Sequence, residues 1–162
     1  LVVIKHALII LMLVASSNVH AINKEDLRAA FIEASQNQKL REQLHERFSE
    51  LDQSIPYYQA YFGASKTLLA EVLLNPYSKY TNFKDGTALV DRAIDADPRN
   101  PELRYLRFLI QVNSPDFLGY NENKKEDYKI IAQAITNADE KESWMVFFEG
   151  FLKNNPKTTD HL

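Results

Sequence analysis

The sequence predicts an all-α protein, a short array of about three helical hairpins followed by a C-terminal capping helix. After residue 21, apolar residues recur three and four positions apart, the spacing of one helix face. No segment alternates apolar and polar residues in the way that a half-buried strand does. Prolines and asparagines interrupt the helical spacing at intervals that suit helix ends. With 162 residues, 45% of them hydrophobic, the chain is long enough to bury one core.

The first 21 residues have the pattern of a secretory signal peptide. Lys5 precedes an uninterrupted apolar run from Ala7 to Ala15, which is too short to span a membrane. Val19 and Ala21 follow at the positions that signal peptidase reads. We therefore expect cleavage after Ala21, a periplasmic or secreted protein, and no stable membrane anchor after signal removal. The alternatives are an uncleaved anchor or an amphipathic first helix.

The first predicted hairpin pairs residues 23–36 with residues 39–52. Asn23 is a suitable N-cap, and two acidic residues follow it in the first turn, where they complement the helix dipole. The polar run at 35–38 weakens the apolar spacing before it resumes. This region is therefore either two short helices or one long bent helix.

The second predicted hairpin pairs residues 56–74 with residues 84–97. Pro56 lies in the first turn of its first helix, where a missing N–H costs nothing. The pair Asn75-Pro76 ends that helix. We expect residues 77–86 to form a longer connection that is partly helical.

The third predicted hairpin pairs residues 101–113 with residues 123–137. Pro98 ends the preceding helix, and Asn100 with Pro101 caps and opens the next one. The predicted capping helix covers residues 139–154. The predicted parts of the chain are a signal peptide at 1–21, a helical domain at 22–154 and a flexible tail at 155–162.

Residues 86–102 resemble the second helix and closing turn of a tetratricopeptide repeat (TPR). Four residues stand at offsets where that family repeats a small residue, an aromatic or aliphatic residue, an alanine and a proline. They are Gly86, Val90, Ala93 and Pro98. Upstream, Phe62-Gly63 resembles the Leu-Gly pair of the first repeat helix, but Gly63 precedes Gly86 by 23 residues instead of about 12. An insertion at 75–83 would account for the difference. The resemblance implies a short TPR-like α-solenoid whose other two hairpins are degenerate.

Three further stretches are similar to a family of small exported helical proteins common in Bacteroidota. They read NPYSKYTNFKDG, AIDADPRNPELRYLRFLIQ and SPDFLGYNENKKED. The resemblance covers most of residues 55–130. It implies export and a helical fold, and it implies no particular activity.

Composition argues against several classes of function. The chain has no cysteine, which excludes disulfides and thiol chemistry. Without the signal, 18 basic residues face 22 acidic residues, and this balance argues against nucleic acid as a partner. Two of the four histidines lie in the signal and His161 lies in the tail, so His45 stands alone and predicts no metal site. We expect no cofactor.

The sequence contains no recognisable catalytic constellation. A nucleophile elbow, a phosphate-binding loop and an EF-hand loop are all missing from it. The densest acidic cluster is formed by Asp91, Asp95 and Asp97. These three carboxylates lie along a single predicted helix, whereas glycoside hydrolysis needs two carboxylates that oppose each other across a cleft. We therefore predict no catalytic residue and no enzymatic activity.

Arg104 and Arg107 form a narrow polar wedge with Gln111 on a helix that is otherwise apolar nearly all round. Such a helix is expected to be central and buried, so the arginines must pair with acids or face a groove. The candidate internal partners are Asp91, Asp95, Glu126 and Asp127. Alternatively, the arginines lie on the concave surface of the array, where they could hold a peptide carboxylate beside Tyr58 and Tyr61.

The sequence thus predicts an exported, non-enzymatic helical-repeat protein that binds an unidentified protein or peptide in the cell envelope. A small-ligand binder or an envelope structural factor is the alternative, and an apolar cavity between hairpins would favour it. An enzyme without a recognisable motif is a further alternative, which a deep pocket with opposed carboxylates would favour.

Overall fold

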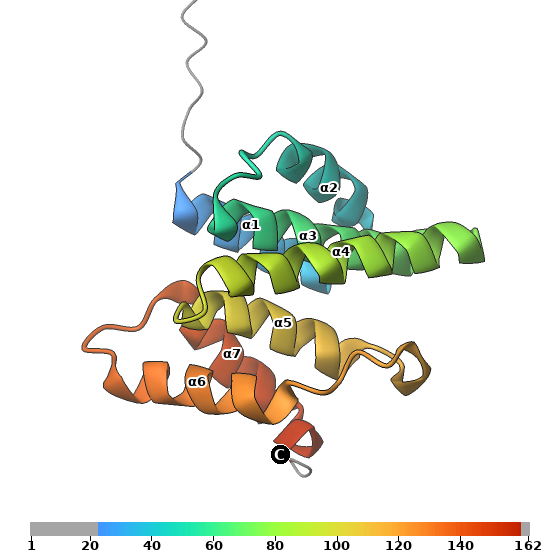
Figure 1. The fold of residues 1–162 in the computed structure, drawn as a ribbon. Coiled ribbons are helices and arrows are strands. Elements are labelled where there is room, and N and C mark those ends of the chain that lie inside the picture. Colours follow the sequence, from blue (N-terminus) through green and yellow to red (C-terminus); the bar gives the residue numbers. More distant parts are fainter. Residues whose placement is uncertain (1–22, 160–162) are drawn as a thin grey trace, which may run out of the picture.

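The computed structural model describes residues 23–159, which are helical with no β-strand among them (Figure 1). The α-helices are α1 (Lys24–Gln36), α2 (Arg41–Ser49), α3 (Pro56–Val72), α4 (Pro76–Ala96), α5 (Pro101–Asn113), α6 (Lys124–Asn137) and α7 (Ser143–Asn154). Three short 3-10 helices accompany them: η1 (Gln38–Leu40), η2 (Asp116–Leu118) and η3 (Pro156–Thr159). The predicted all-α class is confirmed, while the predicted signal peptide lies outside the described residues.

Asparagine caps set several of the helix starts. The side chain of Asn23 accepts a hydrogen bond from the backbone N–H of Glu25 (3.2 Å), and Asn100 accepts one from Glu102 (3.1 Å). Asn37 stands in an extended conformation between α1 and η1, so the first segment forms two short helices instead of one bent helix. At each of these helix starts, the asparagine side chain accepts a hydrogen bond from a backbone N–H group that would otherwise lack a partner.

The second hairpin differs from the expectation at residues 77–86, which belong to the regular helix α4. Helix α3 ends at Val72, just before Asn75, and the side chain of Asn75 accepts a hydrogen bond from the backbone N–H of Ser78 (3.1 Å) as the N-cap of α4. Pro76 then takes the first helical position, where it needs no N–H partner. The pair Asn75-Pro76 therefore starts α4 as well as ending α3, and α4 runs without a break for 21 residues.

Two glycines allow α3 and α4 to touch at their backbones. A Cβ atom placed on Gly63 would lie 2.6 Å from the carbonyl oxygen of Gly86, and the reverse distance is the same. No other residue fits at either position without moving the helices apart. The 22 residues between the glycines lengthen both helices beyond this crossing and include only the short turn at 73–75, so they do not form an irregular insertion.

Helix α5 lies at the centre of the protein. Its residues 102–111 are all buried, as the apolar circumference of this segment predicts. The aromatic ring of Tyr105 packs against Trp144 of α7, and Phe108 packs between Phe148 of α7 and Tyr128 of α6. Figure 1 shows α1–α4 on one side of the protein and α5–α7 on the other. The two halves meet where α5 contacts α3 and α4 and where α7 contacts α1.

Near the C-terminus, Pro156–Thr159 forms the 3-10 helix η3 where a flexible tail was expected. None of the helices within residues 23–159 is both long and apolar enough to cross a membrane.

Candidate functional site

Arg104 and Arg107 make ion pairs inside the protein. Arg107 donates from Nε and Nη2 to the two oxygens of Asp127, both at 2.8 Å, and the carboxylate of Asp127 is completely buried. Arg104 Nη1 lies 3.1 Å from the same carboxylate and 3.5 Å from that of Glu126. The helix α5 thus directs both arginines toward α6, the other helix of the same hairpin, where Asp127 pairs with both of them. This is the internal network that was one of the two sequence-based alternatives.

Asp91 extends this network to α4. It accepts from Arg107 Nη1 at 3.2 Å and from the hydroxyl of Tyr120 at 2.9 Å. Burial alone would lower the pKa of Arg107, but hydrogen bonds and charge attraction to Asp127 raise it above its usual value. Burial, together with the charge of Asp91, also raises the pKa of Tyr120. These shifts keep the arginine charged and the tyrosine neutral over the ordinary pH range.

The sequence predicts that five residues, namely Arg104, Arg107, Gln111, Tyr58 and Tyr61, lie on one ligand surface. The structure does not bring them together on a surface, and this corrects the prediction. Gln111 is buried beside the arginines, and its side-chain amide has no hydrogen-bond partner among the described residues. Tyr61 is buried in a different network, and Tyr58 packs its ring against that of Tyr57. The reason is that α5 is covered on all sides, so that neighbouring helices meet its polar wedge.

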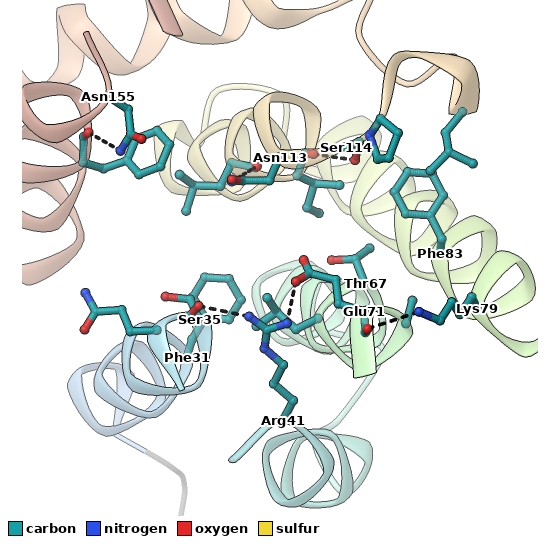
Figure 2. Close-up of a pocket in the computed structure, with 18 of the residues that line it drawn as sticks. Phe31, Ser35, Arg41, Thr67, Glu71, Lys79, Phe83, Asn113, Ser114 and Asn155 are labelled. Atoms are coloured by element: carbon teal, nitrogen blue, oxygen red, sulfur yellow. Dashed lines mark hydrogen bonds and ion pairs between the residues drawn. The ribbon is translucent and has the colours of Figure 1, made fainter. Parts of the chain in front are cut away.

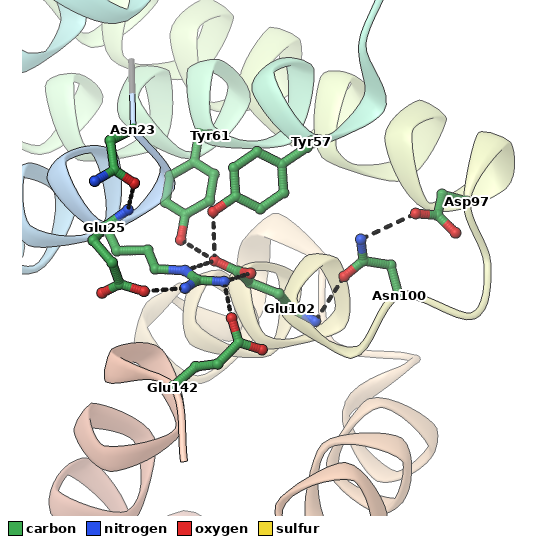
Figure 3. A network of polar contacts seen from close by, with 9 residues as sticks. Asn23, Glu25, Tyr57, Tyr61, Asp97, Asn100, Glu102 and Glu142 are labelled. Atoms are coloured by element: carbon green, nitrogen blue, oxygen red, sulfur yellow. Dashed lines mark hydrogen bonds and ion pairs between the residues drawn. The ribbon is translucent and has the colours of Figure 1, made fainter. Parts of the chain in front are cut away.

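A second buried network joins the two halves at one end of their interface (Figure 3). Arg28 of α1 and Glu102 of α5 form a two-fold pair, with Nε–Oε1 at 2.8 Å and Nη2–Oε2 at 2.6 Å. Tyr57 and Tyr61 of α3 donate to Glu102 Oε1 at 2.8 and 2.6 Å. Arg28 also donates to the carboxylates of Glu25 and Glu142. We call this group of residues the Glu102 network.

Sequence reasoning missed the central pair of the Glu102 network. Arg28 is next to Leu27 and three positions before Phe31, on the face of α1 that the apolar spacing buries. A cation on a buried face needs an acidic partner, and that signal was present in the sequence. Glu102, by contrast, lies in the first turn of α5, where an acidic residue is expected for the helix dipole alone.

The opposite end of the interface opens into a cavity of about 790 Å³ (Figure 2). The Glu102 network uses residues near the starts of α1, α3, α5 and α7, whereas the cavity is lined by residues near the ends of these helices. Its walls are mainly apolar. The apolar side chains that line it include Phe31, Phe83, Leu109, Ile110, Leu118 and Phe147.

Three charged side chains stand in the cavity wall, namely Arg41, Glu71 and Lys79. Arg41 is buried and pairs with the half-exposed carboxylate of Glu71. The ammonium group of Lys79 lies 3.4 Å from the backbone carbonyl oxygen of Glu71. Among residues 23–159, Glu71 is the only acid in the lining, so these residues place no pair of opposed carboxylates in the cavity.

Three other polar side chains of the cavity bond to carbonyls near the ends of helices. Asn113 donates to the carbonyl of Leu109 (2.7 Å), and Ser114 donates to that of Ile110 (2.6 Å), both in α5. Asn155 donates to the carbonyl of Phe151 (2.9 Å) in α7. These three side chains and carbonyls are therefore paired within the protein.

The arrangement can bind a molecule, and it offers few groups for chemistry. Among residues 23–159, no cluster of three or more histidine, cysteine or acidic side chains could hold a metal ion. A search of known protein families, curated proteins and solved structures finds no significant match for the chain. The cavity therefore has to be interpreted from its own geometry.

Proposed function

We propose that this protein is a non-enzymatic binding protein that holds an apolar or amphipathic small molecule in the cavity between its two halves. The observation that carries this proposal is the mainly apolar cavity of about 790 Å³. Ligand sites commonly have volumes of roughly 300–1,000 Å³, with mostly apolar walls and a few polar groups that orient the ligand. The cavity thus favours the small-ligand alternative over the surface of arginines and tyrosines that the sequence suggested.

The compartment and the repeat class belong to the same proposal. The signal-like pattern of residues 1–21 supports an exported protein of the cell envelope, where small apolar molecules need carriers. The backbone contact of Gly63 with Gly86 supports TPR-like packing of the second hairpin. In this account the hairpins serve as walls around a bound molecule.

A larger side chain at Gly150 would fill part of the cavity without a steric clash. It lines the cavity from α7, and a Cβ atom placed there would meet no other atom within 4 Å. Leucine at this position would occupy the free space. It would also favour the helix by about 0.5–1 kcal/mol relative to glycine, so loss of binding could not be ascribed to unfolding.

The test uses N-phenyl-1-naphthylamine, an uncharged probe whose fluorescence rises in an apolar site. We expect the wild-type protein to bind the probe with saturation and Gly150→Leu to bind it at least about tenfold more weakly, the effect of losing roughly 1.4 kcal/mol. Val146→Phe is the matched control, because Val146 is an exposed residue of the same helix outside the cavity lining. Equal binding by Gly150→Leu and wild type would contradict the proposal.

A peptide partner is the second candidate, favoured by exposed apolar side chains near the cavity. Phe117 is 86% exposed and Tyr80 is 53% exposed, although both also line the cavity. Leu74 and Tyr77, at the turn between α3 and α4, are exposed as well. A peptide that used this surface would lose affinity in Phe117→Ser, whereas a small molecule held inside the cavity would be affected mainly by Gly150→Leu.

A further inference from the structure

We infer that the ligand is a single-chain carboxylate such as a fatty acid, with its carboxylate held by Arg41 and Lys79. This inference rests on the proposed function, because it names the class of molecule that the cavity would bind. It depends on three observations: the charge of the cavity wall, the position of Arg41, and the way in which the other polar groups are already used.

The charges in the cavity wall leave one positive charge in excess. Arg41 and Lys79 are cationic, and Glu71 is the only anionic residue of the lining. Apolar walls weaken the screening that water provides, so a charge of opposite sign is attracted more strongly there than at an open surface. The wall therefore favours an anionic ligand over a neutral or cationic one.

Arg41 is held rigidly in a position to receive such an anion. Its side chain donates from Nε to the carbonyl of Ala34 (3.2 Å), from Nη2 to the carbonyl of Ser35 (3.2 Å) and from Nη1 to Glu71. A guanidinium group has five N–H donors, so these three bonds leave two unused. Figure 2 shows the guanidinium group of Arg41 between Ser35 and Glu71, below the open space of the cavity. An arginine fixed in this way loses little entropy when it binds a carboxylate.

The carboxylate of Glu71 pairs with Arg41 in the way that the carboxylate of a ligand would. Its side chain is 49% exposed, whereas that of Arg41 is 6% exposed, so the acid can leave while the arginine stays in place. Lys79 stands next to it and has two ammonium donors that the protein does not use. An incoming carboxylate would thus compete with the Glu71 carboxylate for Arg41, and Lys79 would supply a second cation beside it.

The apolar part of the ligand is better matched by an acyl chain than by a peptide. A buried peptide must find partners for an N–H and a C=O at every residue, while an acyl chain needs none. The helix-end carbonyls around the cavity already accept hydrogen bonds from Arg41, Asn113, Ser114 and Asn155. These carbonyls are therefore not free to pair with the N–H groups of a peptide in the cavity.

The test compares dodecanoate with its methyl ester as competitors of N-phenyl-1-naphthylamine. The two have the same chain, and only the acid carries a charge. We expect dodecanoate to displace the probe from the wild-type protein about tenfold better than the ester, in keeping with charge-assisted hydrogen bonds. We expect Lys79→Gln to weaken dodecanoate several-fold, Glu71→Gln to strengthen it, and neither to change binding of the ester.

Matched controls are available on the same elements of the protein. Lys84→Gln removes an exposed lysine of α4 that does not line the cavity, and Glu42→Gln removes an exposed acid of α2. Both variants should bind dodecanoate as the wild type does. They exclude a general effect of net charge on the affinity for an anion.

The outcomes separate this inference from the proposed function. Equal displacement by acid and ester, or no gain in Glu71→Gln, would overturn the carboxylate assignment and leave the cavity as a binding site. Stronger displacement by an apolar peptide than by dodecanoate would also overturn it, in favour of a peptide partner. If the probe itself did not bind the wild-type protein, the proposed function would fail.

Discussion

The two ends of the interface between the halves differ in how their polar groups are used. At one end, Glu102 accepts from three buried donors that join the halves. At the other end, the Arg41–Glu71 pair stands in a cavity wall, and Glu71 is half exposed. Helices α1, α3, α5 and α7 contribute to both ends, so rigidity at one end and open space at the other are two properties of one packing arrangement. The difference suggests that the closed end gives stability and the open end is available for binding.

The largest expected effect comes from truncating the closed end. We expect Glu102→Ala to lower the free energy of unfolding by about 3–5 kcal/mol, because buried Arg28 loses its two-fold buried partner and keeps only the half-exposed carboxylates of Glu25 and Glu142. Urea unfolding followed by circular dichroism measures the change. The same truncation at the open end, Glu71→Ala, should cost about 1 kcal/mol or less, since Glu71 is half exposed and Arg41 keeps its hydrogen bonds to the carbonyls of Ala34 and Ser35. Similar losses in the two variants would contradict the distinction between the ends.

The double variant Arg28→Met/Glu102→Leu tests the physical reason for that loss. It removes both charges and leaves apolar side chains of similar length. Replacing a buried pair in this way is commonly neutral or stabilising. We therefore expect the double variant to recover most of the stability that Glu102→Ala loses. If it is as unstable as Glu102→Ala, the loss comes from packing and not from the unpaired charge.

A smaller effect is expected at alkaline pH. Burial, followed by the charge of Glu102, raises the pKa of Tyr57 and Tyr61 above the ordinary value of 10. A raised pKa in the folded state gives stability that is complete below pH 10 and is lost as the pH rises above that value. The free energy of unfolding should thus fall as the pH rises from about 10 to about 12, and it should fall less in Tyr57→Phe/Tyr61→Phe. An equal fall in this variant and the wild type would place the titrating group elsewhere.

Much of the fold could be predicted from local signals. Caps such as Asn23 and Asn100 fixed helix starts, and the apolar circumference of residues 102–111 placed α5 at the centre. The start of α4 was placed eight residues too late, at 84 instead of Pro76, because Asn75-Pro76 was interpreted only as a stop. An asparagine followed by proline can both end one helix and cap the next, so that the same two residues fit either reading.

The candidate site could be predicted only in small part. The partners of Arg104 and Arg107 were among the acids named from the sequence, because a buried arginine requires one. The cavity could not be foreseen, since its walls come from the ends of helices that are far apart in the sequence. Whether Phe31 and Phe147 fill a core or line an open space depends on the angle between the halves, and no local pattern encodes that angle.

A methyl NMR titration tests the central claim, that the open end is the binding end, most directly. The protein would be labelled at its isoleucine and leucine methyl groups and titrated with dodecanoate. The largest shifts are expected for Leu109, Ile110 and Leu118, which line the cavity, with little change for Leu27 and Leu103, which are buried near the Glu102 network. Shifts of equal size at both ends, or none at saturating dodecanoate, would contradict the account.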